Sequence, residues 1–379
     1  MINSLFNEDL MNEAVSLAEE HRKYLHTIPE AAFNEFKTTE YIKKVCAAYP
    51  LHFIDIGMET GLVCWLDAGQ DETVALRADI DSVPTEEGYL HLCGHDAHAA
   101  SLLGAIHYLC GIAFSGKNVL FIFQPAEEGT RGAKAMLDHG LLNKVPQKPA
   151  MIFGIHNRPE ADCGNVIVHK GPLMSEKSVF KITIKGKAGH GSLPHKCVDP
   201  IVAAGSLIMG AQTIISRNVD PFSPAICTFN SVHAGLSESS APENAVLTGY
   251  IRSLDHDTHI RMEERLKALA ESTAEAYECG CSTVITRMVP AVYNNDDMYE
   301  IALKAAEKAV GAEHVTDSAP CLASEDFAVF GTEMPSFFYW AGSGTPGRNN
   351  APWHDPAFCV DPEYTKTAVR LLVSSAATK

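Results

Sequence analysis

The stretch Phe121-Ile-Phe-Gln-Pro-Ala-Glu-Glu-Gly129 joins an apolar run to a proline and two adjacent carboxylates. The apolar residues predict a buried β-strand that ends at Pro125. Side chains of neighbouring residues at a strand end diverge, so one glutamate can bind a metal ion while the other reaches a water on that ion. A glutamate pair in a turn is also common on a solvated surface. The residues around Glu127 and Glu128 therefore decide between these two interpretations.

Two further apolar runs end in the same way. Each of these three segments predicts a strand that finishes in an acid or a possible metal ligand. Alternation with helices and polar strand ends is typical of an α/β sheet that builds a site at its carboxyl edge. The three predicted strands and the residues that follow them are Thr73 to Ala78 with Asp79 and Asp81, Val119 to Phe123 with the glutamate pair, and Met151 to Ile155 with His156.

The segment Cys93-Gly-His95-Asp96-Ala-His98 places four possible ligands within six residues. The apolar run Ala99 to Leu109 that follows predicts a buried helix. Cys93 and His95 are spaced so that a thiolate and an imidazole can converge on one cation before that helix begins. A single cysteine or histidine would more often be a packing residue, but this density indicates metal binding.

The composition indicates an ordinary soluble chain of about two domains, because 379 residues exceed what one hydrophobic core normally serves. A formal charge of −17 argues against nucleic acid or an anionic membrane as a partner. No apolar stretch is long enough to span a membrane, and residues 1–10 show no secretory signal. Eleven scattered cysteines favour a reducing cytoplasm over a disulfide scaffold.

The pattern changes near residue 176. Alternating apolar and polar residues from Phe180 to Lys185 predict a strand with one wet face, and Asp199-Pro200 predicts a capped helix start. The following segments complete the order strand, helix, two strands, helix, strand, which is ferredoxin-like. Residues 176–289 are therefore expected to form an inserted α+β domain. Residues 1–175 and 290–379 are expected to form one discontinuous catalytic domain.

Two other motifs do not support other enzyme classes. Gly342-Ser-Gly-Thr-Pro-Gly347 matches a dinucleotide-binding spelling, but Pro346 and the polar run after it leave no helix to bind a pyrophosphate. We therefore predict a loop there. No Gly-x-Ser-x-Gly motif is present, so the main signature of an α/β-hydrolase serine is missing.

Taken together, these segments resemble the M20 metallopeptidase family, in its branch of aminoacylases, hippurate hydrolases and auxin-conjugate hydrolases. The resemblance implies a zinc-peptidase-like catalytic domain with a central mixed sheet and an inserted ferredoxin-like lid and dimerisation domain. It covers almost the whole chain in the family's order. The matching segments are His21 to Glu30, Leu76 to Pro84, Cys93 to Asp96, Gln124 to Gly129, Gly154 to His156, Gly186 to His190, Ser324 to Phe327, and His354.

The resemblance implies a catalytic centre with two divalent metal ions, either Mn²⁺ or Zn²⁺, with Co²⁺ or Ni²⁺ as possible substitutes. Glu127 would be the general base that takes a proton from a metal-activated water and returns it to the leaving amine. Asp81 is similar to the family's acid that orients a ligand without binding metal itself. The implied metal ligands are Cys93, His95, Glu128, His156 and His354.

The resemblance also assigns roles in the inserted domain. His190 looks like the histidine that stabilises the tetrahedral oxyanion, usually across a dimer interface, and His195 is a second candidate near the substrate. Arg252 resembles the arginine that receives the substrate carboxylate, a role that suits its planar fork. Ordinary surface histidines and a solvated strand-end arginine remain the alternatives. A homodimer through the inserted domain is expected, with the strand at residues 179–185 as a possible edge.

We therefore expect a cytoplasmic metal-dependent amidohydrolase that cleaves N-acyl amino acids into a carboxylate and a free amino acid. One departure affects the substrate: Ser239-Ser-Ala-Pro242 stands where relatives typically carry Asn-Val-Ile-Pro, so an amide near the substrate is missing. A dipeptidase or carboxypeptidase, or a hydrolase of aminobenzoyl-glutamate type, is the alternative within enzymes. A metal-binding protein that has lost catalysis is the alternative from another class.

Overall fold

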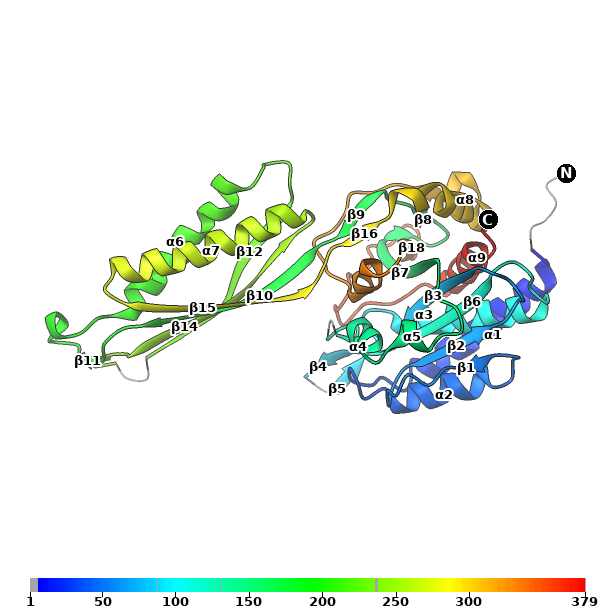
Figure 1. Ribbon diagram of the computed structural model, residues 1–379, viewed down its shortest axis with the longest axis horizontal. Coiled ribbons are helices and arrows are strands. Elements are labelled where there is room, and N and C mark those ends of the chain that lie inside the picture. The colour runs from blue at the N-terminus through cyan, green and yellow to red at the C-terminus, as the bar shows by residue number, and fades with distance from the viewer. Residues whose placement is uncertain (1–5, 87, 130, 236–237, 379) are drawn as a thin grey trace. The chain divides into compact units, whose positions relative to one another are not determined.

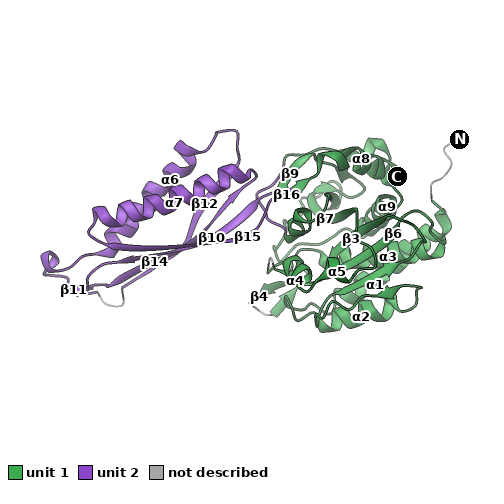
Figure 2. Ribbon diagram, viewed as in Figure 1, with its two compact units in different colours: residues 1–173, 293–319, 326–379 green, residues 174–292, 320–325 purple. Residues whose placement is uncertain are grey.

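The structure is a computed structural model that describes residues 6–86, 88–129, 131–235 and 238–378. It divides into two compact units (Figure 2). Unit 1 covers residues 1–173, 293–319 and 326–379, and unit 2 covers residues 174–292 and 320–325. The first five residues, which were part of the stretch expected to lack a secretory signal, lie outside the described residues.

The unit boundaries differ from the predicted ones by two or three residues at each crossing, and unit 2 also contains residues 320–325. Backbone contacts explain this addition. The N–H of Ser175 donates to the carbonyl of Ala323 over 2.8 Å, and Met174 forms a β-bridge with Cys321. A sequence pattern contains no sign of these pairings, because they join segments about 150 residues apart.

Unit 1 is built on a mixed sheet (Figure 1). Its central strands β6, β3, β7 and β18 are parallel to one another, so their carboxyl ends lie along one edge. In sheet order, the described strands are β1 (His52–Phe53), β2 (Leu62–Leu66), β6 (Asn118–Gln124), β3 (Thr73–Asp79), β7 (Met151–Asp162), β18 (Ser336–Gly344), β8 (Val166–Ile167) and β17 (Val315–Thr316).

Both faces of this sheet are covered. Helices α3 and α9 pack on one face, where Phe121, Phe123 and Phe153 point into the main hydrophobic core. On the other face lie α4 and the 3-10 helix Asp326–Thr332, in which Phe327 packs against Phe338 with ring centroids 4.8 Å apart. The described helices of unit 1 are α1 (Glu8–Leu25), α2 (Phe36–Cys46), α3 (His95–Gly111), α4 (Gly132–Asp138), α5 (Leu141–Lys144), α8 (Tyr299–Val310) and α9 (Tyr364–Ala376).

Two small two-stranded sheets contain the other described strands of unit 1 and the residues where the chain passes between the two units. One consists of β4 (Val83–Thr85) and β5 (Gly88–Leu90), and the other of β9 (Gly171–Met174) and β16 (Val292–Asn294).

Strand β7 is longer than the sequence predicted. The prediction ended it at His156, but β7 continues to Asp162 because its partner β18 also continues, to Gly344. The predicted loop that begins at Gly342 is therefore wrong for its first three residues, which belong to β18. Residues 345–363, which come directly after them, contain no helix, so the rejection of a dinucleotide site stands.

Unit 2 has the predicted order of elements. A four-stranded antiparallel sheet in the order β12-β14-β10-β15 packs against α6 and α7. Asp199 caps α6 by accepting the N–H of Ile201 over 2.9 Å, as predicted. The elements are β10 (Glu176–Lys185), β11 (Gly189–His190), α6 (Pro200–Asn218), β12 (Ala225–Ala234), β13 (Ser240–Ala241), β14 (Asn244–Ser253), α7 (His256–Ala276) and β15 (Gly280–Val289).

The predicted edge strand at residues 179–185 is wrong. It lies within β10, which pairs with β14 on one side and β15 on the other, so its backbone is saturated. The edges of this sheet are β12 and β15. Alternation of apolar and polar residues indicates that one face of a strand is exposed to solvent. Central and edge strands of an antiparallel sheet both have this pattern, so it does not distinguish them. The order of the strands, which the sequence pattern does not contain, decides which strand is the edge.

Among the described residues, no helix combines the length and apolar character needed to cross a lipid bilayer.

Candidate metal centre

The possible metal ligands of unit 1 come from several elements that meet at the carboxyl edge of the sheet. Strand β3 ends at Asp79, opposite Gln124 at the end of β6, and His156 lies on β7. His95 is the first residue of α3, which follows Gly94 in a left-handed conformation with φ of 84°. The expectation that His95 precedes the helix is therefore wrong by one turn.

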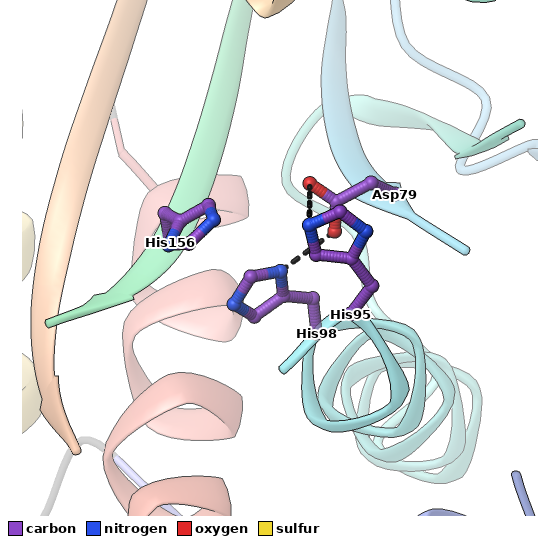
Figure 3. Close-up of side chains that lie close together, drawn as sticks. All are labelled: Asp79, His95, His98 and His156. Atoms are coloured by element: carbon purple, nitrogen blue, oxygen red, sulfur yellow. Dashed lines mark hydrogen bonds and ion pairs between the residues drawn. The ribbon is translucent and has the colours of Figure 1, made fainter. Parts of the chain in front are cut away.

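Several groups of donor atoms form at this edge, one of which joins His95 to Glu127 and Glu128, and two others hold the five predicted ligands. Within each group, one potential ligand atom per residue lies within 4.8 Å of the others. The first contains Cys93, Glu128 and His354, and the second contains Asp79, His95, His98 and His156 (Figure 3). The groups adjoin, because Cys93 Sγ lies 3.5 Å from His156 Nε2 and Glu128 Oε1 lies 4.0 Å from His95 Nε2.

The structure thus brings all five predicted ligands together. The Nε2 of His354 lies 3.2 Å from Glu128 Oε1, and His354 adopts a left-handed conformation with φ of 67°. A left-handed conformation is unfavourable in free energy for a non-glycine residue, and such residues cluster at functional sites. Their role as ligands stays a prediction, which the donor chemistry can test.

The donor set fits a divalent cation. The Nε2 of His95 is buried and makes no hydrogen bond to any residue that the structure describes. Its nearest carboxylate oxygens, on Asp79, Glu127 and Glu128, are 3.8 to 4.0 Å away. A buried nitrogen without a hydrogen bond, surrounded by thiol, imidazole and carboxylate groups, is what a zinc or manganese site needs.

The imidazoles at this site are held in defined states. His156 donates from Nδ1 to the carbonyl of Asn157 over 2.8 Å, which leaves the Nε2 lone pair directed elsewhere. Burial, with the neighbouring His98, lowers the pKa of His156 well below its usual value. For His95, burial alone would lower the pKa, but the charges of Asp79 and Cys93 outweigh it and raise the pKa well above the usual value.

Asp81 lies where an orienting group is expected. Its Oδ1 is 3.1 Å from Nδ1 of His95, and its Oδ2 accepts the backbone N–H of Glu128 over 2.9 Å. One carboxylate therefore fixes both an imidazole ring and the turn that carries the glutamate pair. The side chain is fully buried, and both of its oxygens are engaged.

His98 belongs to the second donor group, but both of its ring nitrogens are occupied. Its Nδ1 lies 2.6 Å from Asp79 Oδ1, and its Nε2 accepts the N–H of Asn157 over 3.0 Å. Asp96, the fourth candidate in that segment, lies 2.9 Å from Nδ1 of His26. Of the four possible ligands in the Cys93 segment, His98 therefore has no free ring nitrogen, and Asp96 lies outside the donor groups.

A supporting network beneath this centre was not predicted from the sequence. Arg77 is fully buried and contacts Asp79 at 2.8 Å and Asp326 at 3.3 Å, while its Nε donates to Gln124 over 2.8 Å. The alternation of Arg77 and Asp79 on β3, continued by Asp81 just after it, was the available signal. Asp326 lies in the matching segment Ser324 to Phe327, but no pattern there indicates Arg77, 249 residues away, as its partner.

The remaining predicted site residues all lie in unit 2. His190 and His195 are exposed, and His190 Nδ1 lies 2.8 Å from the hydroxyl of Ser192. Arg252 is partly buried, and its Nη1 donates to the carbonyl of Leu322 over 2.7 Å. Their catalytic and binding roles stay predictions.

The departure from the family pattern falls beside His190. Strand β13 pairs with β11 so that Ser240 lies opposite His190, and the carbonyl of Ser239 accepts the N–H of Gly191 over 2.8 Å. The serines that replace the usual asparagine and valine thus belong to the immediate surroundings of the candidate oxyanion residue.

The burial of Glu35, which was not predicted from the sequence, leads to a prediction for the pH dependence of stability. Burial, followed by the charge of Asp81, raises its pKa from 4.5 to about 7 against the backbone hydrogen bonds that lower it. The folded chain thus holds this proton more tightly, and the free energy of unfolding should fall as the pH rises from about 4.5 to about 7. Relative to that of Glu35→Gln, the free energy of unfolding of the wild type should fall by at most about 3 kcal/mol over this pH range. Urea unfolding at pH 5 and pH 8 measures the difference, and equal differences at both pH values would contradict it.

Comparison with known proteins gives a consistent result. The sequence pattern described as Peptidase family M20/M25/M40 matches residues 75–378. N-acetylcysteine deacetylase of Bacillus subtilis (strain 168) is 34% identical over 362 residues, which are 92% of each chain. N-acetyldiaminopimelate deacetylase of Geobacillus sp. (strain WCH70) is 34% identical over 338 residues, 86% of this chain and 89% of that protein.

Among solved structures, a dinuclear metal-binding peptidase of the M20 family from Bacillus subtilis superposes with a TM-score of 0.82 and 29% identity, covering 98% of both chains. The described fold, with its mixed central sheet, is thus shared with a solved member of the family. The chain belongs to peptidase family M20/M25/M40 and is a metal-binding hydrolase of amide bonds.

Proposed function

We propose that this chain hydrolyses the amide bond of N-acyl amino acids, giving a carboxylate and a free amino acid, with two divalent metal ions. The observation that carries the proposal is the convergence of five donor side chains and Glu127 at one edge of the sheet of unit 1. The names of the two deacetylase relatives support an acetyl group as the acyl part.

The donor groups suggest how two ions would be held. Cys93, Glu128 and His354 would bind one ion, and His95 and His156 the other, with Cys93 and Glu128 close to both groups. Thiolate and imidazole ligands favour zinc over manganese by affinity, although the supply of metal in the cell also matters. When bound, such ions act as Lewis acids that lower the pKa of a coordinated water.

The protein's own residues would carry the proton transfers and the recognition. Glu127 would take a proton from the attacking water and pass it to the nitrogen of the leaving amine. His190 would donate a hydrogen bond to the oxyanion of the substrate, and Arg252 would pair with the substrate carboxylate. Asp81 would keep His95 and the Glu127 turn in place. His195 would line the substrate site.

The test is a substrate panel coupled to metal analysis. The purified protein, loaded in turn with Mn²⁺, Zn²⁺ and Co²⁺, is assayed on N-acetyl and N-benzoyl amino acids, dipeptides and an aminobenzoyl-glutamate. We expect about two ions per chain and turnover of the N-acyl amino acids, abolished by a chelator. Preference for dipeptides or aminobenzoyl-glutamate would favour the other enzymatic reading. Metal binding without turnover of any amide would favour a metal-binding protein that has lost catalysis.

We further propose a homodimer formed through unit 2 in a reducing cytoplasm. Strands β12 and β15 form the edges of the unit 2 sheet, so either could pair with a second copy in place of the saturated β10. All eleven cysteines are free thiols, which suits a reducing compartment. Light scattering of the purified chain measures the oligomeric state, and a monomer at micromolar concentration would contradict the dimer.

A further inference from the structure

Glu35 sits at the N-cap position of α2, but its side chain does not cap that helix. Glu30 caps it instead, because its two carboxylate oxygens accept the backbone N–H groups of Lys37 and Thr38 over 3.1 and 2.9 Å. The carboxylate of Glu35, which is fully buried, is therefore available for another contact.

That contact is with the turn that carries the glutamate pair. Glu35 Oε1 accepts the backbone N–H of Ala126 over 2.8 Å, across 91 residues of sequence, and the N–H of Phe33 over 3.0 Å. Both donors are non-glycine residues in the left-handed region, with φ of 57° for Ala126 and 61° for Phe33. Such a conformation persists only where the surroundings impose it, and one oxygen of Glu35 contacts both residues.

Ala126 directly precedes Glu127, so its conformation sets the direction in which the next two side chains leave the backbone. Its carbonyl also accepts the N–H of Gly132 over 3.2 Å, which closes the turn. A Cβ atom at Gly132 would overlap the carbonyl oxygen of Pro125, so the turn is tightly packed. The backbone of the turn is thus held on one side by Glu35 and on the other by its own closure.

The segment that carries Glu35 also contacts the loop that contains Asp81 and Ser82. The carbonyl of Glu30 accepts the backbone N–H and the hydroxyl of Ser82 over 3.1 and 2.7 Å. Ser82 follows Asp81, which contacts His95 and the N–H of Glu128. The connection between α1 and α2 therefore contacts both loops that bring carboxylates to the metal centre.

We propose that Glu35 is a positioning residue, which holds Ala126 in its left-handed conformation and thereby aims Glu127 and Glu128 at the reacting groups. This inference rests on the proposed function for the roles of Glu127 and Glu128. A positioning role requires an oxygen at residue 35 that accepts the N–H of Ala126. A merely structural role would require only a side chain that fills the same buried volume.

Two substitutions that keep the size of Glu35, together with a control at a nearby residue, separate the two roles. Glu35→Gln keeps an oxygen acceptor, Glu35→Met keeps the volume without one, and Glu40→Ala is a control at an exposed glutamate of the same helix. The readouts are kcat, KM, metal content, and the visible absorption spectrum of the Co²⁺-loaded protein. That spectrum reports ligand geometry and does not require turnover.

We expect Glu35→Met to lower kcat by about 10- to 100-fold, the scale of a misplaced catalytic group, with KM and metal content close to the wild type. Its cobalt spectrum should differ from that of the wild type, whereas the spectra and rates of Glu35→Gln and Glu40→Ala should not. Should Glu35→Met fail to fold, Glu35→Asp keeps the carboxylate but withdraws it by one methylene group, and the same loss is expected.

Wild-type kcat and an unchanged cobalt spectrum in Glu35→Met would overturn the inference. Equal losses of kcat in Glu35→Met and Glu35→Gln would also overturn it. Both variants keep the side-chain volume but only Glu35→Gln keeps an oxygen acceptor, so equal losses would mean that the acceptor does not matter. If the wild type turns over no amide but the Glu35→Met spectrum changes and the Glu35→Gln spectrum does not, the proposed function fails and the positioning role of Glu35 stands.

Discussion

Glu127→Gln is expected to lower kcat by about 10²- to 10⁴-fold, the usual contribution of a general base, while metal content and folding stay at wild-type values. Glutamine matches the shape of glutamate but cannot accept a proton from the attacking water. Glu127 lies 4.0 Å from His95 Nε2 and is buried, which places it beside the donor groups without making it one of the five predicted ligands.

The control for this variant is Glu59→Gln, which removes the same charge from an exposed position of unit 1. It should keep the wild-type rate. Metal analysis and circular dichroism of both variants separate loss of the base from loss of the site. A Glu127→Gln protein with full metal content and a wild-type rate would show that another group takes the proton.

Arg77→Leu is expected to destabilise unit 1 by about 3 to 5 kcal/mol, because it removes the buried guanidinium that contacts two buried carboxylates. Asp79 and Asp326 are both fully buried and both contact the Arg77 guanidinium. Gln124 and the N–H of Ala133 also donate to Asp326, but neither carries a positive charge. Removing one member of such a network costs more than replacing the whole network by apolar groups would.

The measurement uses the intrinsic fluorescence of unit 1. The three tryptophans, Trp65, Trp340 and Trp353, all belong to unit 1, so urea unfolding followed by their emission reports that unit. Arg348→Leu, at an exposed position of the same unit, is the control and should change the free energy of unfolding by less than about 0.5 kcal/mol. Similar curves for the two variants would mean that the buried network contributes little.

The sequence alone determined much of the architecture, because its signals are local. Apolar runs that end in acids or histidines predicted β3, β6 and β7, and the alternation near Phe180 predicted a strand in unit 2. The resemblance to the M20 family implied the five predicted ligands, and the structure places them in two adjoining groups. Residue chemistry and short spacing are properties that a sequence displays directly.

The tertiary structure decided which distant residues meet, since partners follow from strand order and chain crossings that no local pattern records. In the folded chain, Asp79 and the N–H of Asn157 engage both ring nitrogens of His98, Arg77 pairs with Asp326, and β10 is a central strand. It also placed Glu35 against the turn before Glu127. A carboxylate in a helix-start segment looks like a cap in any sequence, and only the packed backbone shows that it serves another turn instead.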